Sequence, residues 1–127
     1  MRKAISTPSA PAAIGSYSQA IKSGNTVYLS GQIPLDPETM TLVTGPVEKQ
    51  IECVFENLKN VAEAAGGNLN AVTKLTVFLM DLKNMPAINE TIKRYFNEPF
   101  PARTSFQVAA LPKDAEVEVD AIMVLES

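Results

Sequence analysis

The sequence predicts a two-layer α+β fold, in which one mixed or antiparallel sheet carries both helices on a single face. Apolar residues recur at helical spacing in two segments, and about five other segments show the alternation of strands. The predicted order is β-hairpin, helix, strand, helix, strand, strand. Because the chain has 127 residues, we expect residues 1–127 to form a single domain.

The N-terminal third is expected to contain a loop and a hairpin. Residues 7–15 (TPSAPAAIG) are rich in proline and small side chains, which is typical of an ordered loop or a sheet edge. Residues 17–22 and 26–30 predict the two strands of a hairpin, since Ser23-Gly24-Asn25 between them is a turn signal. Residues 34–39 (PLDPET) predict a further turn.

Two amphipathic helices are predicted from periodicity and from their end signals. The first begins after Thr44-Gly45-Pro46 and ends at Gly66-Gly67, where glycine tolerates a left-handed cap. The second begins at Asn84-Met85-Pro86, and Pro99 and Pro101 forbid its continuation. The apolar stripe of the first helix comprises Val47, Ile51, Val54, Phe55, Leu58, Val61, Ala62 and Ala65.

Residues 71–80, 104–109 and 116–125 predict the remaining strands, and alternate residues of a strand point to opposite faces. The almost wholly apolar set is expected to lie under the helices: Val27, Leu29, Leu75, Val77, Leu79, Phe106, Val108, Val117, Val119, Ala121 and Met123. The other set is mixed: Tyr28, Thr76, Phe78, Met80, Arg103, Ser105, Gln107, Glu118, Asp120, Ile122 and Val124. Its apolar members predict contact with another subunit, as in a cyclic homo-oligomer. A monomer with a partly wet sheet face is the alternative.

Composition excludes several classes of chemistry. No histidine is present, which removes Ser-His-Asp and Cys-His nucleophile systems and the usual zinc sites. The single cysteine, Cys53, allows no intramolecular disulfide and indicates a reducing compartment. A net charge of −3 disfavours nucleic acid as the main partner. Neither a membrane-spanning run nor a signal peptide is visible in the sequence, so a cytoplasmic location is expected.

Polar residues of the mixed face form a candidate site. Arg103, Ser105 and Glu118 belong to the same alternating set, provided that no bulge intervenes. The arginine fork suits a carboxylate ligand, and a nearby carboxylate can orient or deprotonate a water molecule. The alternative interpretation is a structural ion pair of Arg103 with Glu118 or with Asp120.

Five segments resemble the Rid protein family, also called YjgF, and in particular its RidA branch. They are PSAPAAIGSYS (8–18), SGQIP (30–34), KLTVFLMD (74–81), FPART (100–104) and ALPKDAEVEVD (110–120). The resemblance covers nearly the whole chain, with the motifs in the same order. It implies a chorismate-mutase-like α+β fold, assembled as a homotrimer with ligand clefts between subunits.

The RidA branch hydrolyses 2-aminoacrylate and 2-aminocrotonate, with their tautomers 2-iminopropanoate and 2-iminobutanoate, to pyruvate or 2-oxobutanoate and ammonia. The resemblance therefore implies an enamine/imine deaminase with a small carboxylate-bearing substrate, which needs no cofactor and no metal. The alternative is a non-catalytic binding or regulatory module for small carboxylic metabolites in the same clefts. Ribonuclease and chaperone roles have also been assigned to relatives. The net negative charge of this chain gives the ribonuclease role little support.

The resemblance also assigns residues. Arg103 matches the arginine that grips the substrate carboxylate, and Glu118 matches the glutamate associated with the attacking water. Tyr17 and Asn89 match residues that line the cleft. We expect proximity to Arg103 to favour the ionised form of Glu118.

Three further positions bear on substrate binding. Ser30 and Gly31 match a pair whose backbone approaches the ligand. Ser105 stands where many family members carry cysteine, so no thiol nucleophile is available there. Residues 96–100 (FNEPF) are a few residues shorter than in common members, which affects a loop at the border of the cleft.

Overall fold

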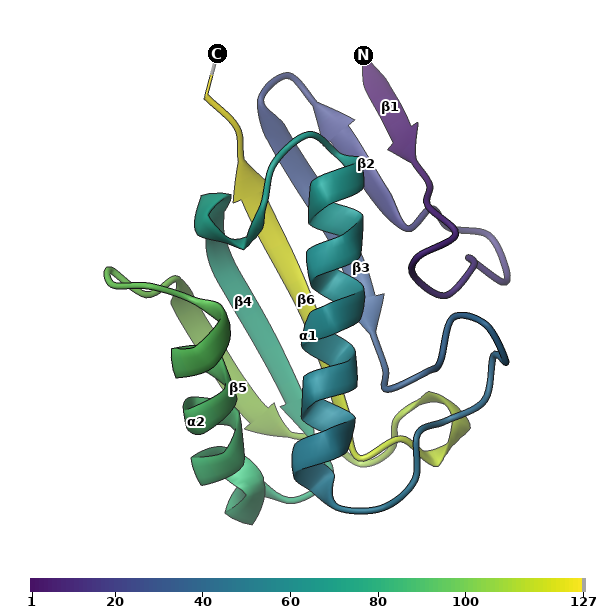
Figure 1. The fold of residues 1–127 in the computed structure, drawn as a ribbon, viewed down its shortest axis with the longest axis vertical. Coiled ribbons are helices and arrows are strands. Elements are labelled where there is room, and N and C mark those ends of the chain that lie inside the picture. The colour runs from purple at the N-terminus through teal and green to yellow at the C-terminus, as the bar shows by residue number, and fades with distance from the viewer. Residues whose placement is uncertain (127) are drawn as a thin grey trace.

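The computed structural model describes residues 1–126, which form a six-stranded sheet covered on one face by two α-helices (Figure 1). The strands are β1 (Arg2–Ile5), β2 (Ala20–Ser23), β3 (Thr26–Gln32), β4 (Val72–Leu79), β5 (Ala102–Gln107) and β6 (Val117–Val124). The helices are α1 (Val47–Ala64) and α2 (Met85–Tyr95), and short 3₁₀ turns span Leu69–Ala71, Leu82–Asn84 and Pro112–Asp114. The predicted α+β fold with both helices on one face is confirmed.

The sheet is mixed, and its strands lie in the order β1-β2-β3-β6-β4-β5. The first three strands form an antiparallel meander, and β6 runs antiparallel to both β3 and β4. Strand β5 is parallel to β4, and α2 supplies the crossover that such a pair requires. Strand β1 was not predicted, because its four residues RKAI carry no apolar alternation.

The two helices begin and end where the sequence signals predict. Pro46 precedes α1, and Pro86 lies in the first turn of α2. After α1, Gly66 adopts a left-handed φ of +94°, and the Gly67 N–H donates to the Ala62 carbonyl at 3.1 Å. Neither helix within residues 1–126 is long and apolar enough to cross a membrane.

The hydrophobic core lies between the helices and the sheet. Its largest fully buried side chains are Phe55, Ile51, Leu58, Leu75, Leu79, Ile88, Met123, Val27, Val54, Val61, Val77 and Val117. They come from α1, α2, β3, β4 and β6, so the predicted apolar set is confirmed for these three strands. The Phe55 ring holds the two helices together, because its centroid lies 5.8 Å from those of both Tyr95 and Phe96.

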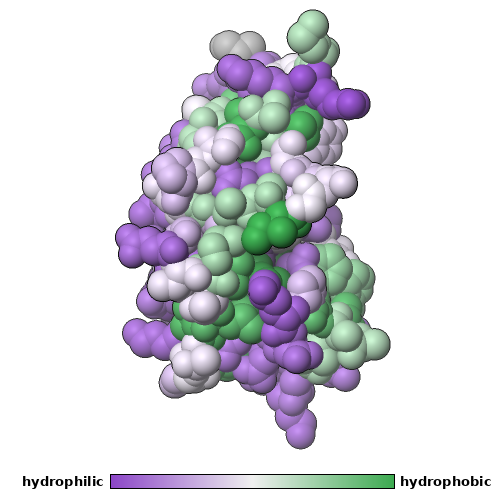
Figure 2. All heavy atoms as spheres, turned by 90° about the vertical axis from the view of Figure 1, so that its right-hand side faces the viewer, coloured by the Kyte–Doolittle hydropathy of each residue, from purple (hydrophilic) through white to green (hydrophobic). Residues whose placement is uncertain are grey.

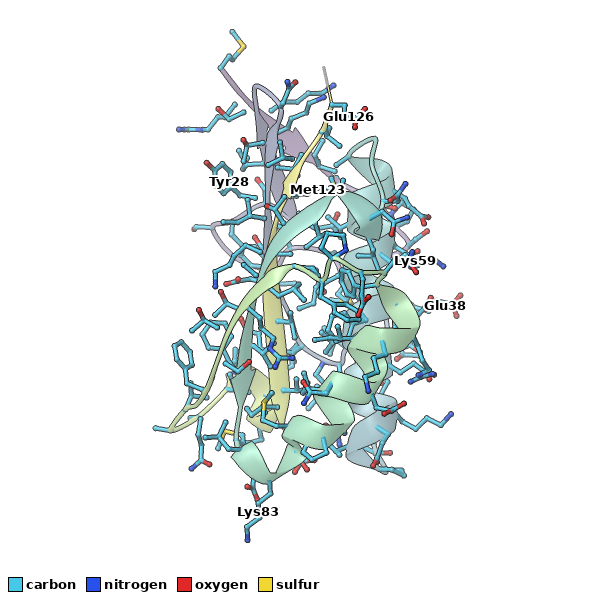
Figure 3. The ribbon with its side chains drawn as sticks, turned by 90° about the vertical axis from the view of Figure 1, so that its left-hand side faces the viewer. Tyr28, Glu38, Lys59, Lys83, Met123 and Glu126 are labelled. Carbon is cyan, nitrogen blue, oxygen red and sulfur yellow. The ribbon has the colours of Figure 1, made fainter. Side chains whose placement is uncertain are left out.

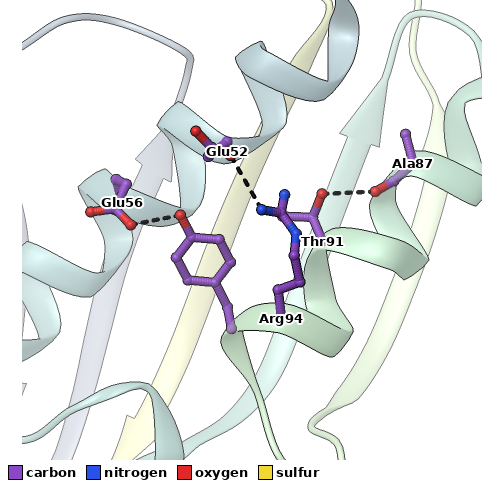
Figure 4. Close-up of polar contacts among 6 residues, drawn as sticks. Glu52, Glu56, Ala87, Thr91 and Arg94 are labelled. Carbon is purple, nitrogen blue, oxygen red and sulfur yellow. Dashed lines mark hydrogen bonds and ion pairs between the residues drawn. The ribbon is translucent and has the colours of Figure 1, made fainter.

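Polar contacts between α1 and α2 flank this aromatic cluster (Figure 4). The Tyr95 hydroxyl donates to Glu56 Oε2 at 2.6 Å, and Arg94 lies 3.3 Å from Glu52 in an exposed ion pair. Burial, together with the Glu56 carboxylate, raises the pKa of the Tyr95 phenol. Because the ion pair is exposed to water, we ascribe the pairing of the helices mainly to the buried rings.

The alternation predicted for β5 is wrong. Residues opposite each other in the β4–β5 ladder point to the same face, and Leu75 and Val77 of the core lie opposite Arg103 and Ser105. Arg103 and Ser105 therefore lie on the helix side of the sheet, and Phe106 on the other. The physical reason is that β5 is an edge strand: Phe106 is 43% exposed and packs against Phe78 on the outer face, with ring centroids 5.2 Å apart.

The sheet face that carries no helix is partly apolar. In Figure 3 the Tyr28 side chain projects on the side of the sheet opposite the helices. Tyr28 is 52% exposed and lies opposite Ile122, and the neighbouring Val124 is 45% exposed. With Phe78 and Phe106, these side chains form the outer sheet face. Apolar surface gathered in this way is typical of an interaction surface.

Truncation of the central ring tests the proposed role of the aromatic cluster. Phe55→Ala is expected to lower the free energy of unfolding by about 3–5 kcal/mol, because it leaves a cavity between α1 and α2. Urea denaturation followed by circular dichroism measures the change. Glu63→Ala on the exposed side of α1 is the control and should change stability by about 0.5 kcal/mol or less. An equally small effect of Phe55→Ala would contradict this assignment.

Candidate active site

A cavity of about 570 Å³ contains four of the seven predicted site residues. Tyr17, Ser30, Gly31 and Glu118 all line it, together with residues of the N-terminal loop, the loop after β3 and the turn before β6. Figure 2 shows the side of the molecule on which these loops lie, where apolar side chains gather in the middle of the face. The remaining lining residues are Pro11, Ala12, Ile14, Gln19, Gln32, Ile33, Leu35, Met40, Pro112 and Lys113.

Glu118 reaches the cavity next to the backbone of Gly31. The β3–β6 register shifts between Leu29 and Gln32, which places Ser30 and Gly31 in an irregular segment of β3. A Cβ atom built at Gly31 would overlap the Glu118 carboxylate and lie 2.9 Å from its Cδ. Glycine at position 31 therefore lets the carboxylate lie against the main chain, and a larger residue there would displace the Glu118 carboxylate.

Hydrogen bonds hold the N-terminal loop over this cavity. The buried Gln19 side chain donates to the carbonyls of Thr7, Ala10 and Pro11 at 3.1, 3.2 and 2.7 Å, and accepts from the Thr7 N–H at 2.7 Å. The Ser30 hydroxyl donates to the Ser18 carbonyl at 2.6 Å, so it acts within the chain. Gln19 was missed in the sequence, where a glutamine beside a predicted strand is indistinguishable from a surface residue.

Arg103 and Asn89 form a second cluster. Arg103 Nη1 donates to Asn89 Oδ1 at 2.7 Å, which orients the guanidinium towards α2. Both residues line a separate cavity of about 450 Å³, with Lys93 and Phe100 among its walls. Ser105 follows on the same side of β5, and its Oγ is buried without a hydrogen-bond partner among the described residues. A buried hydroxyl without a partner is unfavourable unless another molecule satisfies it.

A single chain does not bring Arg103 and Glu118 together. Arg103 lies opposite Leu75 and Glu118 opposite Phe78, on opposite faces and with β4 between their strands. Two strand spacings and three residues along the strand separate their Cα atoms by about 14 Å. The expected shared face is wrong, and the alternative ion pairs with Glu118 or Asp120 are also absent. Among residues 1–126 the only ion pair is that of Arg94 and Glu52.

The electrostatic environment of Glu118 differs from the expected one. Burial raises the pKa of its carboxyl, and the negative charge of Asp120 raises it further. Arg103 is too distant to favour ionisation within one chain, so that expectation is wrong for the isolated subunit. Burial also raises the pKa of Asp120, against the lowering effects of a hydrogen bond from Thr76 and of the Lys74 charge. The cavity therefore contains a carboxyl that binds its proton more tightly than an exposed glutamate.

The single cysteine is a partly buried thiol. Burial raises the pKa of the Cys53 thiol to about 11, so it is protonated at neutral pH. Its Sγ lies 3.6 Å from the Leu35 carbonyl oxygen, to which it donates. Within residues 1–126, no group of three or more His, Cys, Asp or Glu side chains is placed to hold a metal ion.

Two further cavity residues have an uncommon backbone conformation. Met40 has a φ of +58° and Lys113 a φ of +56°, and both line the cavity beside Glu118. Residues other than glycine and asparagine rarely adopt this left-handed backbone conformation. Neither residue could be found from the sequence, because nothing in the local pattern marks a methionine or a lysine as left-handed.

Comparison with known proteins identifies relatives along the whole chain. Residues 7–125 match the family model described as Endoribonuclease L-PSP. A relative from Dermatophagoides farinae, named 2-iminobutanoate/2-iminopropanoate deaminase, is 47% identical over 98% of both chains. The crystal structure of RidA from an Antarctic Psychrobacter species is 52% identical, covers 97% of this chain and 99% of its own, and has a TM-score of 0.93. That of E. coli TdcF with bound serine is 39% identical, covers 98% and 99%, and has a TM-score of 0.92.

The effect of Asp120 on Glu118 can be measured directly. Asp120→Asn is expected to lower the pKa of Glu118, because it removes the neighbouring negative charge that favours protonation. Carbon-13 NMR titration of the glutamate carboxyl groups provides the measurement. Asp114→Asn is the control, and equal titration curves for wild type and Asp120→Asn would contradict the prediction.

Proposed function

The chain belongs to the endoribonuclease L-PSP family, which is the YjgF/Rid family, and we infer that it is a deaminase of reactive imines. The substrates are 2-iminobutanoate and 2-iminopropanoate, which water converts to 2-oxobutanoate or pyruvate and ammonia. Sequence identity of 47% over 98% of both chains to a relative named for this activity supports the function most directly. Relatives from mouse and human, 47% and 43% identical, carry the same name.

We propose that the catalytic centre is shared between subunits of a homotrimer. Glu118 and Arg103 lie on opposite faces of one sheet, so one chain cannot present both to a substrate of three or four carbon atoms. A neighbouring copy that packs against the outer sheet face can bring its Arg103 to the Glu118 cavity. The exposed apolar side chains of Tyr28, Phe106 and Val124 supply a surface for that contact.

In this centre Arg103 binds the substrate carboxylate. The planar guanidinium forms two parallel hydrogen bonds to a carboxylate, and Asn89 holds it in position at 2.7 Å. Tyr17, which is 53% exposed at the cavity, covers the bound substrate. The unpartnered Ser105 hydroxyl is available to the ligand from the same strand as Arg103. These contacts fix the position of the substrate C2 atom relative to the Glu118 carboxylate.

Glu118 acts on the attacking water. A protonated imine is already electrophilic at C2, so the step needs an oriented nucleophile and no metal ion or covalent intermediate. Water adds to C2 and its proton passes to Glu118. Glu118 then returns this proton to the nitrogen of the carbinolamine, and ammonia leaves as the C–N bond breaks, the hydroxyl proton is released to solvent and the C=O bond forms. Only the ionised carboxylate accepts the proton, so activity is lost as the pH falls through the pKa that Glu118 has in the assembled site.

A second function is a binding module for small carboxylates without turnover. The structure of TdcF with bound serine, 39% identical to this chain, favours it, because an amino acid carries the carboxylate that Arg103 would bind. Both functions require the Arg103 cluster. Only the deaminase requires Glu118 beside a reacting water molecule.

A coupled assay separates the two functions. A threonine or serine dehydratase supplies the imine, and its decay and the formation of keto acid are followed with and without this protein. Wild type should accelerate decay, and Glu118→Gln should lower kcat by about 100-fold or more while the assembly stays intact. Glu63→Gln, an exposed position on α1, is the matched control. No acceleration by folded wild type, together with saturable binding of serine, would favour the binding module.

The shared site is tested by mixing two inactive variants. Arg103→Ala keeps Glu118, and Glu118→Gln keeps Arg103. If each site takes one residue from each of two neighbouring subunits, trimers refolded from an equal mixture should regain about one quarter of wild-type activity. Light scattering coupled to size-exclusion chromatography confirms the subunit number. Activity no higher than that of the separate variants would place both residues in the site of one subunit.

A further inference from the structure

The loop after β3 forms a closed hairpin that ends at the Glu118 cavity. Leu35 pairs with Leu42, the Asp36 N–H donates to the Thr41 carbonyl at 2.9 Å, and the Met40 N–H donates to the Asp36 carbonyl at 2.8 Å. Asp36 Oδ1 also accepts from the N–H groups of Glu38 and Thr39. These hydrogen bonds determine the path of the main chain at the tip of the hairpin.

Met40 occupies the left-handed position of this hairpin. Hairpin loops of this kind commonly end in a residue with positive φ, where glycine or asparagine fits without strain. Met40 has a φ of +58°, so its Cβ conflicts with its own main chain. The methionine side chain does not stabilise the turn itself better than glycine would. The strain therefore indicates that the Met40 side chain has a role elsewhere.

The Met40 side chain lines the cavity that contains Glu118. It is half-buried and adds to an apolar wall formed with Ile14, Ile33 and Leu35. Of the three non-glycine residues with positive φ among residues 1–126, Met40 and Lys113 line this cavity, and the third is Asp114. Two separate turns thus each place a non-glycine residue with positive φ in the wall of the same cavity.

We propose that Met40 is a specificity-determining residue, whose thioether contacts the apolar end of the substrate. The inference rests on the proposed deaminase function, and it specifies which part of the cavity selects the substrate side chain. Arg103 binds the substrate carboxylate and Glu118 acts on the water. All substrates of this class share these two features, so neither residue distinguishes between substrates. Discrimination between a methyl and an ethyl group needs an apolar wall, and a flexible methionine adapts to both lengths while making more contacts with the longer.

Substitutions at position 40 separate the effect of this residue on the turn from its effect on the apolar wall of the cavity. Met40→Gly and Met40→Asn both relieve the backbone strain and remove the apolar side chain, whereas Met40→Leu retains an apolar side chain. Asp114→Gly is the matched control, because Asp114 has a φ of +58° and does not line the cavity. Met40→Asn and Asp114→Gly should each raise the melting temperature by about 2–4 °C.

Two ratios measure how far the apolar wall at Met40 selects the longer substrate side chain. The first is kcat/KM for 2-iminobutanoate over 2-iminopropanoate. The second is the affinity for 2-oxobutanoate over pyruvate, measured by calorimetry, which requires no turnover. Met40→Gly and Met40→Asn should lower both ratios by about 3-fold to 10-fold, whereas Met40→Leu and Asp114→Gly should leave them within about 2-fold of wild type.

The outcomes distinguish this proposal from the deaminase function itself. A wild type that does not hydrolyse imines would refute the function, and the keto-acid affinities would still test Met40. Unchanged ratios in a more stable Met40→Asn variant would overturn the proposal. A less stable Met40→Asn variant with unchanged ratios would also overturn it, because Met40 would then be a packing residue of the hairpin.

Discussion

A sheet has two faces, and the two helices of this chain cover only one of them. The helix side buries Phe55, Leu75 and Val117 and closes the core. The outer face keeps the aromatic side chains of Tyr28 and Phe106 about half exposed, so this face presents apolar surface that the chain itself does not cover. The sheet also divides the chemistry, because Arg103 points to the covered side and Glu118 to the outer side. In the proposed trimer, assembly and the Glu118 side of the active site therefore depend on the same uncovered face.

Periodicity was a reliable guide where burial alone decides which way a side chain points. Helix α1 and strands β4 and β6 were predicted from the sequence because one face of each is buried by the chain itself. Strand β5 shows the limit of this reasoning. Phe106 belongs to the outer face, where it packs against Phe78, and a sequence pattern does not distinguish this packing from burial under a helix. Strand β1 depends on main-chain pairing with β2, which leaves no apolar signature.

The candidate site was predictable to a similar degree. Four of the residues that the family resemblance assigns, Tyr17, Ser30, Gly31 and Glu118, line one cavity, and their roles stay predictions. The grouping of Arg103 with Glu118 failed because it relied on the alternation of β5. The role of Gln19 and the conformation of Met40 were not predictable, since one depends on carbonyl groups of a folded loop and the other is a positive φ. Both properties arise from the path of the main chain.

The raised pKa of Glu118 links assembly to chemistry. In the isolated chain the carboxyl is desolvated, and its neighbouring charge is the negative Asp120, so its proton is held tightly. A guanidinium within about 4–6 Å lowers a carboxyl pKa by about 1–3 units, which opposes both effects. Docking of a second subunit's arginine would thus favour the ionised form that accepts a proton from water. In the proposed trimer, the complete site thus places the glutamate next to the positive charge that favours its ionised form.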